Sequence, residues 1–369
     1  MATTQEDPEV HLAAEDDVSD SEQDLESIRS ETTSVKDSIL EHRIENGRSY
    51  HKYKDGKYAW PNDNMEQDRQ DMQHEICILT FHERLGFAPP CDEGAKVGRV
   101  LDLGTGTGLW AIDYGDQHPE TEFEVDDVEE EWLYSRPFDY IHLRFMNGSI
   151  SDWRKIIQKA YDNLVPGSYF EIQEGDFVIK ADDDTLPPEK PLAQFVSLIR
   201  EAAEKFGRRF APVPEMRELM IDVGFENVAQ QNFKWPSNAW PKDEHYKRIG
   251  EWNFHNFVDA AEAMALATLT RVHNWTKEEV QVFLVGVRKD MRDKKIHSYM
   301  PIYTLVGRKP LKENSPAPPQ SQSTPADAEA STAAASCFSS VTTAFGHPQR
   351  SMTLSEETLS MNILSCSRI

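Results

Sequence analysis

Apolar runs alternate with amphipathic segments across the middle of the chain. The runs at 100–103 and 138–143 are rich in apolar residues, which is typical of strands buried on both faces of a sheet. The segments at 109–117 and 154–164 have the amphipathic spacing of helices, and a further strand at 169–173 follows the turn at Pro166 and Gly167. This alternation predicts an α/β fold with a parallel, doubly wound sheet.

The same pattern continues downstream with longer helices. Gly224 is placed to end one of these helices, because glycine readily adopts the left-handed conformation at a helix terminus. The expected helices cover 191–206, 214–223, 248–272 and 276–291, and the expected strands cover 225–235 and 298–309. These helices are predicted to be insertions in the sheet-containing domain.

Upstream of the first strand, the pattern predicts a helical cap. An apolar stripe indicates a helix from about Met65 to Leu85, and Asn62 or Asp63 can cap its start. Before this helix lies a loop rich in aromatic residues: Tyr50, Tyr53, Tyr58 and Trp60. Such side chains either pack the cap against the core or form a lid that excludes water from a site.

Composition divides the chain into four parts. Residues 1–33 carry eleven acids and one Arg with almost no aromatic residues, so they are expected to be a disordered acidic arm. The cap then covers 34–95, and the sheet-containing domain with its helical insertions covers 96–310. Residues 311–369 are rich in Ser, Pro and Ala and are expected to be a disordered tail.

Charge and cysteine content narrow the possible partners and location. The net charge of −25 argues against a nucleic acid or an anionic membrane as the main partner. The four cysteines make no zinc-binding spacing, and no metal cluster or membrane-spanning run is evident. The N-terminus lacks the pattern of a signal peptide. We therefore expect a soluble protein with reduced cysteines in the cytosol or nucleus.

A glycine-rich turn, VLDLGTGTG at 100–108, predicts a nucleotide-type cofactor site. Gly104, Gly106 and Gly108 allow a sharp turn and close approach of a ligand, and the helix that follows presents free N–H groups. A dinucleotide fingerprint has the spacing G-x-G-x-x-G and an acid about twenty residues downstream. Here the glycines alternate and Asp102 lies at the strand end, which distinguishes this turn from that fingerprint.

The turn resembles the first motif of class I S-adenosylmethionine methyltransferases, and the wider chain resembles the fungal LaeA-like members. The carriers of the resemblance are ENGRSYHKY, WPNDNMEQDR, RVLDLGTGTGLWAIDYGDQHP, DDVEEEW, FDYIHLRFMNGSISDW, YFEIQE and VRKDMRDKKIHSYMPIYTLVGRKP. The resemblance implies a Rossmann-like fold and S-adenosyl-L-methionine as cofactor. It also implies a role in secondary metabolism or its regulation, a small-molecule or protein methyl acceptor, and a possible regulatory protein partner.

The resemblance also places individual residues. Asp102 and the three loop glycines match the part of the motif that holds the methionine end of the cofactor. Asp127 and Val128 match the region that lies beside the adenine, although in another alignment Asp127 falls where an acid holds the ribose, with Asp126 as its neighbour. Arg144 matches the strand end where methionine and acceptor meet. Glu129 to Glu131 are expected to form a solvated face. Candidates for a catalytic group are His142, Arg144 and Glu171, and by residue type also His51, His74 and Tyr50.

One interval is shorter than this family requires. Only residues 109–137 separate the glycine loop from the next buried strand, and two helices with two strands need more than about thirty residues before loops are added. The sheet is therefore predicted to lack one strand and one helix on the cofactor side. Either Asp126 or Asp127 serves the ribose, or that recognition is lost. The chain is then an active methyltransferase or a non-catalytic relative that acts as a scaffold.

Overall fold

The central element is a seven-stranded mixed sheet. The computed structural model describes residues 42–45, 47–51, 61–124 and 128–311. The strand order is β4 (Glu122–Glu124), β3 (Arg99–Leu103), β5 (Phe138–Arg144), β6 (Leu164–Gly175), β9 (Ser298–Arg308) and β7 (Lys180–Ala181), and β8 (Glu226–Pro236) also pairs with β9. The first four strands are parallel, as predicted, whereas β9 runs antiparallel to its neighbours.

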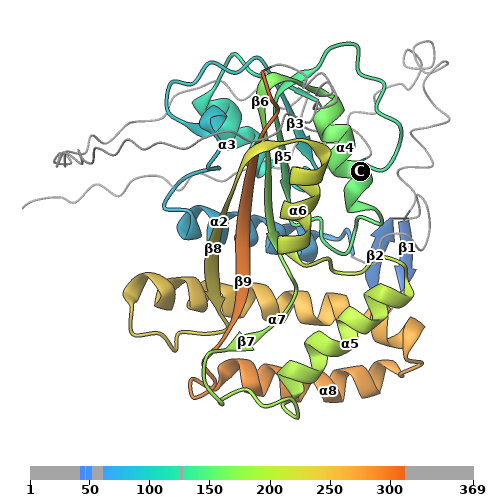
Figure 1. Cartoon of the computed structure of the whole chain (residues 1–369). Coiled ribbons are helices and arrows are strands. Elements are labelled where there is room, and N and C mark those ends of the chain that lie inside the picture. The colour runs from blue at the N-terminus through green and yellow to red at the C-terminus, as the bar shows by residue number, and fades with distance from the viewer. Residues whose placement is uncertain (1–41, 46, 52–60, 125–127, 312–369) are drawn as a thin grey trace, which may run out of the picture.

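Alternate residues of the strands pack on opposite faces of the sheet. Leu101 and Leu103 face a core covered by α4 (Trp153–Asp162) and α6 (Val213–Val223). Val100 of the same strand joins Trp110 and Tyr114 of α3 (Leu109–Gln117) in a second core. Helices therefore cover both faces, so the doubly wound prediction is confirmed (Figure 1).

The shortened interval contains one helix and one strand in its described part. Helix α3 is followed by β4, and residues 128–137 form no helix or strand. Val128 and Trp132 of this stretch are buried in the core beside α4. The prediction of a missing strand and helix is thus confirmed, and irregular chain covers this edge of the core instead.

A helical layer lies at the lower end of the sheet in Figure 1. It consists of α5 (Pro191–Lys205), α7 (Glu244–Val272) and α8 (Lys277–Arg292), which share one apolar core. These elements match the predicted helices to within a few residues, except that α7 begins four residues before the predicted start. Within the described ranges, no helix combines the length and apolarity that crossing a bilayer requires.

The cap contains helix α2 (Asn64–Thr80), which packs against α7. Asp63 caps α2 by accepting a hydrogen bond from the Glu66 amide, as predicted. The helix ends five residues before the predicted Leu85, because His82 and Glu83 adopt positive φ angles of 54° and 63°. The short helical turn η1 (Pro89–Cys91) leads into β3.

A hairpin that the sequence analysis did not predict precedes α2. It pairs β1 (His42–Glu45) with β2 (Arg48–His51), and Tyr50 of β2 is buried. Tyr53, Tyr58 and Trp60 of the predicted aromatic loop lie outside the described residues, as do the acidic arm and the tail beyond Leu311.

Candidate functional site

The glycine loop joins β3 to α3 in a backbone conformation that requires glycine. Gly104, Gly106 and Gly108 have φ angles of 74°, 60° and 86°. A Cβ atom on Gly104 would lie 2.2 Å from Met146 Sδ, and one on Gly106 would lie 2.8 Å from Gln70 Oε1. No side chain caps the start of α3 at Gly108, so the N–H groups of its first turn remain available to a ligand.

Asp102, near the end of β3, is hydrogen-bonded to His142 on the neighbouring strand β5. His142 Nδ1 lies 2.8 Å from Asp102 Oδ1, and the imidazole stacks on Trp110 with ring centroids 3.7 Å apart. His142 is fully buried, and its Nε2 has no hydrogen-bond partner among the described residues. A carboxylate accepts, so Nδ1 carries the proton and His142 orients Asp102.

Arg144, at the carboxyl end of β5, meets the cap helix. Its Nη2 lies 3.0 Å from His74 Nδ1, and His74 Nε2 lies 2.8 Å from Asp113 Oδ2 on α3. The next residue, Phe145, has a φ of 50°, a strained value of the kind that clusters at functional sites. The structure thus joins β5, α2 and α3 through one polar chain beside the glycine loop.

The side chain of Glu171 is enclosed by the protein and hydrogen-bonded within it. Its side chain is fully buried, and its carboxylate accepts hydrogen bonds from the amides of Phe87 and Ala88. The Tyr140 hydroxyl and the Gln173 amide donate to the same carboxylate. These contacts tie the segment before β3 to the sheet.

The adenine-side residues are only partly described. Asp126 and Asp127 lie outside the described residues, whereas Val128 is buried in the core. Glu129 forms an ion pair with Arg208 at 2.8 Å and accepts hydrogen bonds from Ser151. Burial raises the pKa of Glu129, but the bonds from Arg208 and Ser151 outweigh it and lower the pKa to about 2.

The predicted solvated face is therefore wrong at Glu129, whose partner lies in the connection between α5 and α6. Glu130 and Glu131 are exposed, as predicted. The backbone carbonyls of Val128 and Glu130 accept hydrogen bonds from Lys159 of α4. Side-chain contacts thus anchor the stretch that follows β4.

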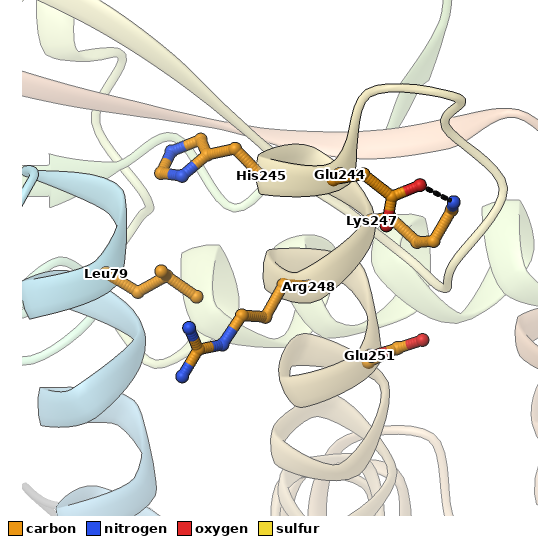
Figure 2. Close-up of a pocket in the computed structure, with 6 residues that line it drawn as sticks. All are labelled: Leu79, Glu244, His245, Lys247, Arg248 and Glu251. Atoms are coloured by element: carbon orange, nitrogen blue, oxygen red, sulfur yellow. Dashed lines mark hydrogen bonds and ion pairs between the residues drawn. The ribbon is translucent and has the colours of Figure 1, made fainter.

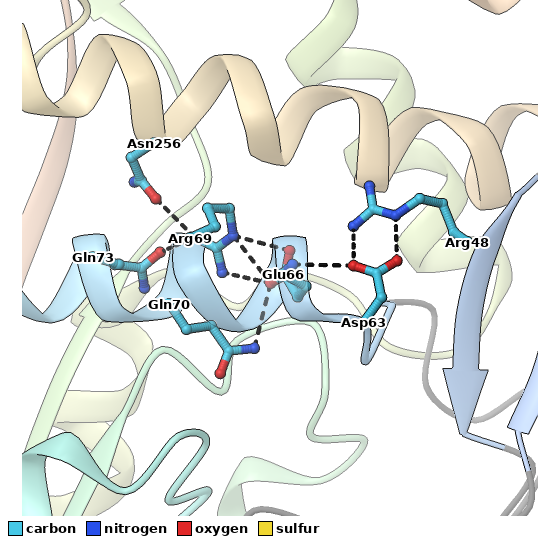
Figure 3. Close-up of polar contacts among 7 residues, drawn as sticks. All are labelled: Arg48, Asp63, Glu66, Arg69, Gln70, Gln73 and Asn256. Atoms are coloured by element: carbon cyan, nitrogen blue, oxygen red, sulfur yellow. Dashed lines mark hydrogen bonds and ion pairs between the residues drawn. The ribbon is translucent and has the colours of Figure 1, made fainter. Parts of the chain in front are cut away.

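A polar network connects α2 to α7 and to the hairpin β1–β2 (Figure 3). Arg69 binds Glu66 through several hydrogen bonds and Asn256 of α7 at 2.8 Å. Gln70 donates to Glu66, and its side-chain oxygen lies against Gly106. Arg48 of the hairpin binds the capping carboxylate of Asp63.

His74 was a candidate only by residue type, and Gln70 and Asp113 were not predicted from the sequence. Glu66, Gln70 and His74 recur every four residues and therefore share one face of α2, which was the available signal for Gln70. Of the other candidates, Tyr50 packs against Arg271 of α7 and makes none of the contacts above, and the His51 side chain is outside the described residues.

A groove of about 440 Å³ lies away from the glycine loop, between the end of α2 and the start of α7 (Figure 2). Its lining residues are Leu79, Glu244, His245, Lys247, Arg248 and Glu251. None of the predicted site residues lines it. Where the chain is described, no three His, Cys, Asp or Glu side chains form a group that could hold a metal ion.

The chain is similar in sequence to a methyltransferase-domain model and to several fungal proteins. A methyltransferase-domain model matches residues 69–230. The methyltransferase pytC of Aspergillus terreus is 38% identical over 301 residues, which cover 76% of this chain and 92% of pytC. The secondary metabolism regulator LAE1 of Cochliobolus heterostrophus is 34% identical, over 72% of this chain and 94% of LAE1.

The secondary metabolism regulator laeA of Aspergillus fumigatus is 32% identical, over 72% of this chain and 76% of laeA. The glycine loop, the doubly wound sheet and the similarity to these relatives each indicate a methyltransferase fold. The chain belongs to the LaeA-like family of fungal secondary-metabolism methyltransferases and regulators.

Proposed function

We propose that this protein is an S-adenosylmethionine-dependent methyltransferase that acts on a small molecule or a protein side chain in fungal secondary metabolism. The observation that carries the proposal is the glycine loop, whose three glycines have positive φ angles and where Met146 and Gln70 leave no space for a Cβ atom at Gly104 or Gly106. Free N–H groups at the start of α3 and the oriented carboxylate of Asp102 adjoin this loop. Family membership supports the same cofactor class.

The chemistry of the surrounding donors fits this cofactor. Asp102 offers a carboxylate to the ammonium group of its methionine part, and the Arg144 guanidinium offers a counter-charge to its carboxylate. Gln173 Oε1 and Asp71 Oδ1 are buried acceptors that lack partners among the described residues. Val128, with Asp126 or Asp127, is proposed for the adenine and ribose.

The residues in contact with the loop are suited to positioning. S-adenosylmethionine supplies an electrophilic methyl group on a sulfonium, and transfer by in-line displacement depends mainly on alignment and exclusion of water. His142 and Glu171 are both fully buried and bonded within the protein, so we assign them to support of the site rather than to proton transfer. Arg144 is proposed to bind and orient.

A non-catalytic scaffold is the alternative function. The shortened interval favours it, because β4 has only three residues and the stretch after it contains no further strand in its described part. The missing strand would weaken binding of the cofactor's ribose. As to compartment, Cys77 and Cys91 are both free thiols, which supports a reducing location in the cytosol or nucleus.

Calorimetric titration with S-adenosylmethionine and with S-adenosylhomocysteine tests the proposal. We expect one site per chain with a dissociation constant in the micromolar range, about −7 to −8 kcal/mol. Absence of binding at millimolar cofactor, with the protein folded by circular dichroism, would overturn the enzyme proposal. Binding without methyl transfer to any component of a fungal extract supplied with radiolabelled cofactor would favour the scaffold.

A further inference from the structure

The neutral form of His74 is fixed by its two neighbours. An Arg side chain only donates hydrogen bonds, so His74 Nδ1 must accept the bond from Arg144 Nη2 at 3.0 Å. The proton of the imidazole then lies on Nε2, which donates to Asp113 Oδ2 at 2.8 Å. His74 is only 2% exposed, so water does not substitute for either contact.

The Arg144 side chain keeps its positive charge available in this arrangement. Among the described residues, no carboxylate forms an ion pair with Arg144, although Asp113 lies on the far side of the His74 ring. The imidazole therefore holds the guanidinium in place without neutralising it. A guanidinium presents five N–H donors, of which His74 takes one, and the Cys77 thiol also lies against Arg144.

We propose that His74 is a positioning residue that holds Arg144 ready for the carboxylate of the methyl donor, and that protonation of His74 releases Arg144. This inference rests on the proposed function, because it assigns a ligand group to Arg144. Protonated His74 has two donors, so its Nδ1–H would point at another donor and at a like charge 3.0 Å away. The contact with Arg144 would then be repulsive.

The charged groups around His74 determine where this change occurs. Burial lowers the pKa of His74 below its usual 6.5, and the charge of Arg144 lowers it further. Asp113 from α3 and Asp71 from α2 raise it. Next to Arg144 lies the Cys77 thiol of α2, whose pKa burial raises to about 11. The buried Glu174 of β6 lies near Cys77, and burial raises the pKa of Glu174 to about 8.

The test measures the dissociation constant of S-adenosylhomocysteine from pH 7.5 to pH 5. Wild-type protein should bind with constant affinity at the upper end, and its affinity should fall by about tenfold per pH unit below the lowered pKa of His74. In His74→Asn the amide oxygen can accept from Arg144 but does not titrate, so the fall attributable to His74 should disappear. His245→Asn, in the groove at the start of α7, is the matched histidine control and should keep the wild-type profile.

Two further measurements distinguish a role of His74 from misfolding of the variant and from failure of the proposed function. Asp113→Asn, at a side chain 43% exposed, removes a group that raises the pKa of His74, so the fall should move to lower pH. Methylthioadenosine has no methionine carboxylate, so its affinity should not change with pH through His74. If neither ligand binds at any pH, the proposed function fails. If S-adenosylhomocysteine binds but wild type and His74→Asn share one profile, the role of His74 is overturned.

Discussion

The two ends of the proposed cofactor site are held by different kinds of contact. At the methionine end, Asp102 and Arg144 project from strand ends in the middle of the sheet, and buried histidines bond each of them. At the adenine end, β4 is a three-residue strand at the sheet edge, and Glu129 anchors the stretch after it through a partly exposed ion pair.

This difference explains why the second end could be shortened without loss of the fold. A central strand such as β3 pairs on both sides, so its removal would break two ladders. A strand beyond β4 would pair on one side only, and Val128 and Trp132 cover the core beside α4 without it. The methionine end therefore depends on the sheet, whereas the adenine end depends on side-chain anchors.

The largest expected effect is that of Gly104→Ala. A left-handed φ of 74° costs a non-glycine residue about 1–2 kcal/mol, and the added Cβ would displace the Met146 side chain. We expect cofactor affinity to fall by roughly 100-fold or more in a calorimetric titration. Gly94→Ala is the control, because Gly94 has a φ of 76° with no atom near its Cβ position.

In the control, the same backbone strain should lower the melting temperature while cofactor affinity stays within a few-fold of wild type. Equal losses of affinity in the two variants would show that strain alone, and not the shape of the loop, accounts for the effect. The proposal that the methionine end of the site depends on the shape of the glycine loop would then lose its main support.

A smaller effect is expected for Asp102→Ala. Loss of one charge-assisted contact should weaken cofactor binding by about 1.5–3 kcal/mol, which is roughly 10- to 150-fold. Calorimetry with S-adenosylhomocysteine measures the change, and circular dichroism checks that His142, which loses its partner, does not unfold the site. Unchanged affinity would mean that the methionine end has been placed incorrectly.

The smallest effect is expected for Glu129→Gln. Removing this partly exposed ion pair should reduce the free energy of unfolding by about 1 kcal/mol and change cofactor affinity only slightly. The lowered pKa of Glu129 contributes stability above its ordinary value near 4.5 that is lost as pH falls toward 2. Urea unfolding at pH 7 and at pH 3 should therefore show a difference from wild type that shrinks at the lower pH.

Glu131→Gln is the matched control, since this neighbouring acid is exposed. It should leave the unfolding curve at both pH values within error of wild type. A Glu129→Gln protein as stable as the control would remove the proposed anchor of the adenine end.

Local patterns were sufficient to predict the sheet and the conformation of the glycine turn. The buried strands, the glycine turn and the cap at Asp63 all depend on residues a few positions apart, and the interval at 109–137 could be judged by length alone. The hairpin β1–β2 was missed because its strands have four residues each and mix charged with aromatic side chains.

Contacts between distant residues could not be predicted in this way. Arg208 lies 79 positions from Glu129, so no spacing in the sequence connects them. His74 was a candidate by residue type, but its role depends on Asp113 and Arg144, which come from two other elements. Glu171 was predicted as a candidate base from its residue type and location in a strand, and that pattern could not show that its oxygens accept hydrogen bonds from the Phe87 and Ala88 amides.

The bonds of Glu171 have a practical consequence for expression. A truncated protein that begins at residue 96, where composition changes, would retain the sheet but leave this buried carboxylate without the Phe87 and Ala88 amides. An unpaired buried acid is costly, so such a fragment would be poorly stable and prone to aggregate. Shortened proteins for crystallisation should keep the segment from α2 onward.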